Sequence, residues 1–443
     1  MLRAEVKPHV LFSDGAVLQR GCVVPVWGKA GDGEKVTVKF AGQTVSAVAS
    51  NGQWLVRLRP MPANAVPQTM TIAGSNTVDV KNLLVGDVWI CSGQSNMQFE
   101  MHWLTDAAKQ IALANDPLLR MLGVPQGGAT QPQRDFAGNW SECTSQSVEW
   151  FSAVAYFFGR DVRLSQKVPV GLICSRVGGT AAENWLSWPA LAANPKLRQI
   201  AGTQAVEGGP SFLYNAMIAP LQPFAISGVI WYQGESNAYD AQRAIAYREL
   251  FTTLIKCWRD EWGQGEFPFL FVQIAPHNDM VPEIRESQLL TWQQTPNTAM
   301  IVITDCGNAT DIHPKPKEPV GARLALAARA VAYGEPIEYS GPVFAGMKVR
   351  GDKATLSFTH VGGGLVAKDG ALKGFTIAGA DNKFVPAEAV IDDNTVIASS
   401  QQVAQPVAVR YGWANVPDVN LLNKDGLPAT PFRTDSGKEV TEK

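Results

Sequence analysis

Five short apolar runs, separated by stretches of helical periodicity, limit the possible folds of this chain more than any other feature. They read VWIC at 88–91, VGLICS at 170–175, GVIWYQ at 228–233, FPFLFVQIA at 267–275 and AMIVIT at 299–304. Strands that are apolar on both faces and alternate with helices are typical of a parallel sheet that helices cover on both sides. The sequence therefore predicts a central α/β domain.

Two segments show the apolar stripe of a helix that packs on such a sheet. The segment after Asn237 repeats large apolar residues at helical spacing, and a second stripe follows Pro316. The members of the two stripes are Tyr247, Leu250, Phe251, Leu254, Ile255 and Trp258, and then Val320, Leu324, Ala327, Ala328 and Val331. The α/β unit is predicted to end near Gly334.

The segments on either side of the α/β unit have the texture of short β-strands. In KVTVKF at 35–40 and WLVRLR at 54–59, apolar and polar residues alternate. Similar short runs return after residue 340, for example TVIAS at 395–399. Alternation with period two indicates strands that are buried on one face. We predict a β-sandwich region at 1–84, an α/β domain at 85–335 and a C-terminal β region at 336–443.

Charge and composition argue against several classes of partner. Lysine and arginine total 38 against 40 for aspartate and glutamate, without a basic stripe, and no apolar run is long enough to span a bilayer. We therefore expect no nucleic-acid partner and no membrane partner, and the oligomeric state is left open. The six cysteines form no C-x-x-C pair, so we expect buried fillers, with neither a metal site nor a cofactor.

Residues suited to acyl transfer follow four of the apolar runs. Ser95 follows the first run, Gly178 and Gly179 the second, the segment QGESN at 233–237 the third, and Asp311 with His313 the last. Ligands of open α/β sheets bind at the carboxyl ends of the strands, so these residues are expected to meet. Each also has a structural interpretation, because a serine can cap a helix and paired glycines can form a tight turn.

The chemistry of ester hydrolysis explains these residue types. A serine hydroxyl needs a base to take its proton, and an imidazole base is usually oriented by a carboxylate. His313 is the natural base and Asp311 the nearest carboxylate. The tetrahedral intermediate needs hydrogen-bond donors, which a glycine N–H or a carboxamide supplies. Gly179, Gln233 and Asn237 fit that role.

Four longer motifs resemble the sialate O-acetylesterase family of the SGNH hydrolase superfamily. They are GDVWICSGQSNMQFEM, GGTAAENW, WYQGESNA and DIHPKPKEPVGARLALAA, and the opening LFSDGAVLQR is similar too. The resemblance implies a flavodoxin-like three-layer α/β/α SGNH hydrolase domain and metal-independent ester hydrolysis. It assigns Ser95 as nucleophile, His313 as base, and the N–H groups of Ser95 and Gly179 to the oxyanion hole.

Two departures from the superfamily pattern leave alternatives open. The third block is QGESN, so either Gln233 or Asn237 completes the oxyanion hole. The last block is Asp-x-His, so the group that orients His313 is Asp311, Asp305, Glu235 or a backbone carbonyl. Among residues within or near the matched blocks, Gln94, Glu235, Trp185 and Arg176 are expected to contact substrate or support the site. Arg176 either meets a sugar carboxylate or is a structural arginine.

The resemblance also implies a substrate and a location. The expected substrates are O-acetyl groups on sialic acids, with acetylated xylan or other plant glycans as the alternative. A non-catalytic carbohydrate-binding protein, with Trp103, Trp185 and Trp231 as stacking platforms, is a third hypothesis. Many bacterial relatives are exported, so we expect a periplasmic or secreted protein whose signal peptide is absent from this sequence, with the cytoplasm as the other option.

Overall fold

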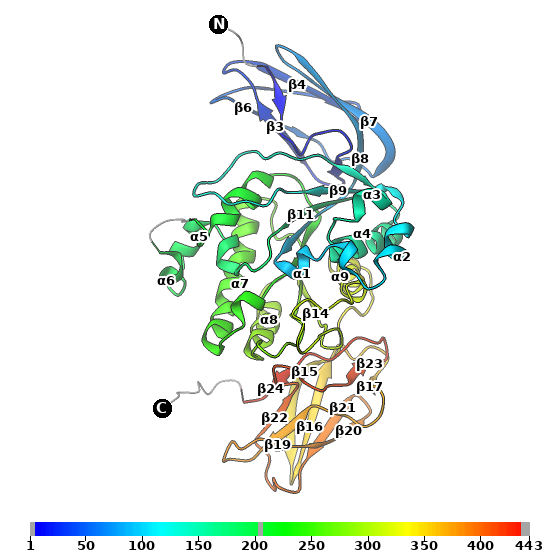
Figure 1. Ribbon diagram of the computed structural model, residues 1–443, viewed down its shortest axis with the longest axis vertical. Helices are drawn as coiled ribbons and strands as arrows, with labels where there is room; N and C mark the ends of the chain where they lie inside the picture. Colours follow the sequence, from blue (N-terminus) through cyan, green and yellow to red (C-terminus); the bar gives the residue numbers. More distant parts are fainter. Residues whose placement is uncertain (1–4, 203–206, 436–443) are drawn as a thin grey trace.

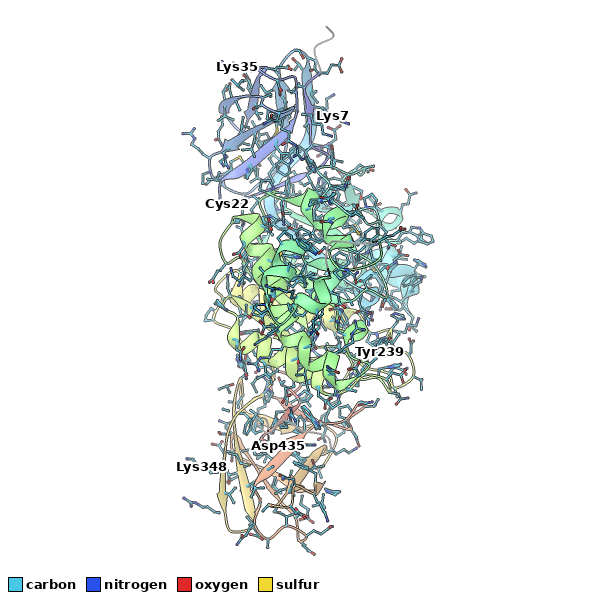
Figure 2. The ribbon with its side chains drawn as sticks, turned by 90° about the vertical axis from the view of Figure 1, so that its left-hand side faces the viewer. Lys7, Cys22, Lys35, Tyr239, Lys348 and Asp435 are labelled. Atoms are coloured by element: carbon cyan, nitrogen blue, oxygen red, sulfur yellow. The ribbon has the colours of Figure 1, made fainter. Side chains whose placement is uncertain are left out.

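The computed structural model describes residues 5–202 and 207–435, which form three regions in a row. An N-terminal β-sandwich lies at one end, an α/β domain in the middle and a second β-sandwich at the other end (Figure 1). Figure 2 shows the same order from the side, with Lys35 on the first region, Tyr239 on the second and Lys348 on the third. The expected α/β fold with flanking β-sandwiches is confirmed.

The N-terminal sandwich has two sheets whose inner faces form its core. One sheet contains β1 (Lys7–Pro8), β3 (Val24–Lys29) and β6 (Gln53–Leu58). The other contains β4 (Lys35–Phe40), β5 (Gln43–Val48), β7 (Asn64–Ala73) and the first part of β8 (Thr77–Gly93). Val36, Val38 and Phe40 of β4 are buried while Lys35 and Lys39 are exposed, as the alternation predicted.

The second part of β8 is the middle strand of the parallel sheet. The strand order is β10-β9-β11-β8-β12-β13-β14, and β10 is antiparallel to its neighbour. The bounds are β9 (Asp116–Gly123), β10 (Ser141–Cys143), β11 (Val170–Arg176), β12 (Gly228–Tyr232), β13 (Phe269–Val272) and β14 (Thr298–Ile301), and β2 (Val17–Gln19) pairs with β8 in parallel. After β8, the strands β9 and β11 are added on one side of β8, and the chain then crosses to the other side, where β12 pairs with β8. The point where the order reverses therefore lies between β8 and β12.

Helices cover both faces of this sheet (Figure 1). On one face α4 (Ala153–Gln166) packs against α9 (Glu318–Val331), and on the other α7 (Ala241–Trp262) packs against α8 (Glu283–Gln294). The predicted stripe of α7 is buried, which confirms the helix after Asn237. Shorter helices are α1 (Ser95–Gln98), α2 (Ala107–Leu113), α3 (Ser145–Val148), α5 (Trp188–Ala193) and α6 (Arg198–Ala201).

The C-terminal sandwich has a hydrophobic core of its own, centred on residues such as Leu356, Ile377 and Val396. One four-stranded sheet has the order β15 (Val343–Arg350), β16 (Lys353–Thr359), β21 (Thr395–Ser399) and β20 (Glu388–Asp392). The other has the order β19 (Val385–Pro386), β18 (Phe375–Ala378), β22 (Ala408–Tyr411) and β24 (Phe432–Arg433). A separate pair is formed by β17 (Leu365–Ala367) and β23 (Leu421–Asn423). An ion pair between Arg433 and Glu286 joins it to α8.

Two further expectations concern cysteines and membrane spans. All six cysteines are free, and five of them are buried, which confirms that they fill the core. Among the helices of residues 5–202 and 207–435, none combines the length and apolar character that a membrane span requires. The predicted domain boundary at 84/85 falls inside β8, which pairs with β7 up to Val85, with β11 from Asp87 and with β12 from Trp89.

Candidate active site

Ser95 lies at the point where the strand order reverses. β8 ends at Gly93, and the backbone N–H of Gln94 donates to the carbonyl of Tyr232 at the end of β12 (3.0 Å). Ser95 then begins the single turn of α1. The N-cap of that turn is Gln94, and Ser95 Oγ bonds to no other described residue, so the serine is not serving as a helix cap. Ser95 is half-buried, and its hydroxyl is free to donate to a base, which is what activates a serine nucleophile.

The segment that carries His313 lies against the Ser95 turn. Asn96 follows Ser95, and its side-chain N–H donates to the backbone carbonyl of Ile312 (2.9 Å), the residue before His313. Burial, and then the positive charge of Lys317, lower the pKa of His313 below its ordinary value. The ring makes no hydrogen bond within the described part of the chain. An unprotonated imidazole next to the serine turn is the form that a general base needs.

Asp311 contacts the backbone of His313 rather than its ring. One carboxylate oxygen accepts the backbone N–H of His313 (2.9 Å), which fixes the two residues in a tight turn. The negative charge of Asp311 raises the pKa of His313, against burial. The alternative carboxylates have other partners: Asp305 forms a two-pronged pair with Arg323 (2.7 Å for both bonds) and Glu235 accepts from Asn96. In this structure Asp311 is therefore not bonded to the imidazole, and only its charge reaches the ring.

The paired glycines bring a free N–H close to the nucleophile. A Cβ on Gly178 would lie 3.4 Å from Ser95 Cβ, so the glycine loop is in contact with the serine. Gly178 N–H donates to the Gln98 side chain (2.8 Å), whereas the N–H of Gly179 has no acceptor among the described residues. Gly179 has φ +71, a conformation that favours glycine. Of the two, Gly179 has the available oxyanion donor.

In the third block, one of the two carboxamide side chains has an amide hydrogen without an acceptor among the described residues. Both side-chain hydrogens of Gln233 are used, one on the carbonyl of Thr180 (3.2 Å) and one on Asn237 Oδ1 (2.8 Å). Asn237 donates one hydrogen to Glu183 (3.0 Å), and its second hydrogen has no acceptor in the described residues. Asn237 thus has the capacity to donate to an oxyanion, while Gln233 fixes its orientation.

The other predicted site residues, Gln94, Trp185 and Arg176, are buried. Gln94 is 2% exposed and accepts the N–H of Ser236 (3.2 Å), which ties the first block to the third. Trp185 is fully buried and donates to Thr180 (3.0 Å). Arg176 is 8% exposed and contacts Glu100 (3.9 Å), and its Nε has no partner among the described atoms. The burial of Arg176 and its contact with Glu100 favour the structural interpretation.

The expected stacking platforms are partly wrong. Trp185 and Trp231 are fully buried in the packing of α7 on the sheet, so neither can meet a sugar. Trp103 is 41% exposed, and sequence reasoning missed Trp150, which is 61% exposed. The His102 ring lies between them, with centroids 5.3 Å from Trp103 and 4.3 Å from Trp150. We call these three residues the aromatic surface; no periodic pattern in the sequence pointed to it.

Comparisons with known proteins identify the family of this chain. The sequence profile described as "Carbohydrate esterase, sialic acid-specific acetylesterase" matches residues 85–329. The chain belongs to this family. It is 32% identical to the sialate O-acetylesterases of Homo sapiens and Pongo abelii, over 95% of this chain and 91% of each relative. The crystal structure of a carbohydrate acetylesterase from Xanthomonas citri superimposes with TM-score 0.91 and 43% identity, over 98% of this chain and 100% of that one.

Membership of this family makes the protein a carbohydrate esterase, a class of carboxylic ester hydrolase. The hypothesis of a non-catalytic carbohydrate-binding protein is set aside. Within the described residues, no group of three or more histidine, cysteine, aspartate or glutamate side chains is placed to hold a metal ion. The assignment of individual catalytic residues rests on the geometry above.

Proposed function

We propose that this esterase removes O-acetyl groups from carbohydrates through an acyl-enzyme on Ser95, with His313 as general base. The observation that carries the proposal is the bond from Asn96 to Ile312, which joins the unengaged serine to the histidine segment. Residues that lie 216 positions apart in the chain meet here, at the strand ends where α/β enzymes bind ligands.

The proposed reaction proceeds in two steps. Ser95 Oγ attacks the acetyl carbon while His313 takes the hydroxyl proton. The N–H groups of Ser95 and Gly179 and the free hydrogen of Asn237 stabilise the oxyanion. The imidazolium then gives its proton to the departing sugar oxygen. Water attacks the acetyl-serine with His313 as base again, acetate leaves, and Ser95 regains its proton.

O-acetylated sialic acid is the substrate that we propose first. The support comes from the family description and from the human and Pongo abelii relatives, which are named sialate O-acetylesterases. The aromatic surface fits a sugar, because exposed tryptophan rings stack on the apolar faces of pyranoses while leaving the hydroxyls hydrated. The carboxylate of sialic acid has no partner in Arg176, which is buried against Glu100.

Acetylated xylan or another neutral plant glycan is the second candidate substrate. The placement of Arg176 favours it, since a neutral sugar needs no cationic partner. The Xanthomonas citri relative, at 43% identity, is described as a carbohydrate acetylesterase. Mass spectrometry of acetate and sugar products, with matched panels of O-acetylated sialic acids and xylo-oligosaccharides, distinguishes the two substrates.

The catalytic proposal is tested with Ser95→Ala. Loss of a catalytic serine lowers kcat by about a millionfold in well-studied hydrolases, and we expect a loss of this order with an acetylated chromogenic ester. An organophosphonate should label Ser95 in the parent enzyme, as shown by peptide mass spectrometry. A folded Ser95→Ala protein with parental turnover would rule the mechanism out.

We also propose a periplasmic or secreted location, which fractionation of cells of the source organism tests.

A further inference from the structure

Asn96 belongs to the first motif block, and its side chain bonds to residues of the third and the fourth blocks. Its side chain is fully buried, and its amide donates to Glu235 (2.6 Å) and to the carbonyl of Ile312 (2.9 Å). Its side-chain oxygen accepts a hydrogen bond from Lys317 Nζ. The residue next to the nucleophile is therefore bonded at once to the third block, to the segment of His313 and to the start of α9.

Lys317 is buried as completely as an aliphatic core residue, with 0% exposure. Its ammonium lies 4.7 Å from the ring centroid of Phe99 and 5.5 Å from that of Tyr232, at cation–π distance. Burial lowers the pKa of Lys317 to about 7, while the charge of Glu235 opposes this shift. A long cationic side chain is rarely placed in such a site unless it has partners there.

Glu235 completes the buried cluster. Its carboxylate is 3% exposed, and one oxygen has no hydrogen-bond partner among the described atoms. Burial raises the pKa of Glu235, whereas the Asn96 bond and the charge of Lys317 lower it. Each of the two ionisable groups therefore depends on the other and on Asn96. Asn96 bonds to both groups and so joins them, and through its bond to Ile312 it links them to the His313 segment.

We propose that Asn96 and Lys317 are positioning residues for the hydrolysis: with Glu235, they hold the His313 segment against the Ser95 turn. The inference rests on the proposed function, because it assumes that Ser95 and His313 react. The charged and titratable groups that act on His313 are Lys317, Asp311, Lys315 and His277, and those that act on Lys317 are Glu235, Asp311, Cys306 and Lys315.

The sign of the pH effect follows from these charges. The Lys317 charge lowers the pKa of His313, so without it this pKa rises. A general base must be unprotonated to act, and a higher pKa moves the acidic limb of the pH profile upwards. The limb lies below the pKa of Lys317, about 7, where the lysine is charged in the parent enzyme.

The test replaces Lys317 by methionine, which keeps the length of the side chain and removes its charge. With 4-nitrophenyl acetate, we expect kcat to fall by about tenfold to a hundredfold, since small misplacements of reacting groups cost this much. KM should change less than about threefold, because the substitution leaves ground-state binding of the ester intact. The acidic limb of kcat/KM should move to higher pH. Lys39→Met is the control: it removes an exposed lysine of β4 in the N-terminal sandwich, and we expect kcat within about twofold of the parent value and an unshifted acidic limb.

A second variant keeps the test decisive if Lys317→Met fails to fold. Glu235→Gln with Lys317→Met removes both charges, so no unpaired buried charge remains. We expect this folded double variant to show the same fall in kcat as Lys317→Met and the same shift of the acidic limb of kcat/KM to higher pH. Parental kcat and pH profile in either folded variant would overturn the inference. Ser95→Ala in the same assay separates the outcomes: if it is inactive while the Lys317 variants match the parent, only the positioning role fails.

Discussion

At the scale of single residues, hydrogen-bond capacity distinguishes groups that the sequence left equivalent. Gln233 and Asn237 are both buried carboxamides of the third block, and either type could donate to an oxyanion. The count of donors separates them, because both hydrogens of Gln233 are used and one of Asn237 is free. The two residues therefore have different parts in the site.

Substitution of Asn237 tests this difference. Removing one oxyanion donor costs about a hundred- to a thousandfold in kcat, and we expect Asn237→Ala to lose that much with little change in KM. Gln233→Ala should cost less, since it loosens the orientation of Asn237 without removing the donor. Steady-state kinetics of both variants provide the comparison. Parental kcat in both would make the third block structural.

Asp311→Asn tests whether the aspartate acts through its charge. The amide oxygen can still accept the backbone N–H of His313, so the turn is retained. The Asp311 charge raises the pKa of His313, so its removal lowers this pKa and moves the acidic limb of kcat/KM to lower pH. We expect kcat to fall by about ten- to a hundredfold, less than the roughly 10⁴-fold loss for a carboxylate bonded to the ring. A loss of the larger size would mean that Asp311 reaches the imidazole during turnover.

At the scale of elements, β8 runs from the N-terminal sandwich to the turn that carries Ser95. Its first part belongs to the N-terminal sandwich, and its last residue is followed by the nucleophile turn. Between them, Asp87 is 1% exposed and accepts hydrogen bonds from Arg20 (2.8 and 2.9 Å) and from Tyr333 (3.0 Å). One carboxylate thus joins the N-terminal region, the central strand and the segment after α9.

Asp87→Ala should therefore affect stability rather than chemistry. Removing one partner of a buried ion pair costs about 3 kcal/mol or more, and we expect this decrease in the free energy of unfolding by urea denaturation. Asp87 lies at the start of the parallel part of β8, so kcat of the folded variant should equal that of the parent. Asp79→Ala, on an exposed position of the same strand, should change stability by less than about 0.5 kcal/mol. An equal effect of the two variants would contradict the proposed role of Asp87.

At the scale of the whole molecule, the three regions are not equally independent. One hydrophobic core runs from Val6 in the N-terminal sandwich through the parallel sheet, and the C-terminal sandwich has a separate core. The C-terminal region meets α8 through ring contacts of Trp292 with Tyr339 and His360 and through polar contacts. The polar contacts include the Arg433–Glu286 pair (2.8 Å) and a bond from the buried Arg285 to the carbonyl of Ala414. The N-terminal sandwich and the α/β domain are thus one packing unit.

The sequence by itself determined the architecture, the family and the main candidates for chemistry. Apolar runs and helical stripes are local patterns, and they predicted β8, β11, β12, β13, β14, α7 and α9 because burial on both faces of a sheet dictates residue type. Motif order pointed to Ser95 and His313. The burial of Trp231 follows from its place in the run GVIWYQ, although it was also considered as a stacking platform. The burial of Trp185, which lies outside the apolar runs, was not predicted, because no local pattern distinguishes a buried tryptophan from an exposed one there.

Only the tertiary structure decided which side chains meet. The bonds of Asn96 to Ile312 and Lys317, the count of donors on Asn237, and the contact of Asp311 with a backbone N–H rather than a ring all join or orient groups that no local pattern relates. A lysine at the start of a helix looks solvent-exposed in sequence, since lysines are almost never buried. Lys317 is buried because the ends of β8 and β12 and the segment after β14 converge there, and convergence is a property of the folded chain.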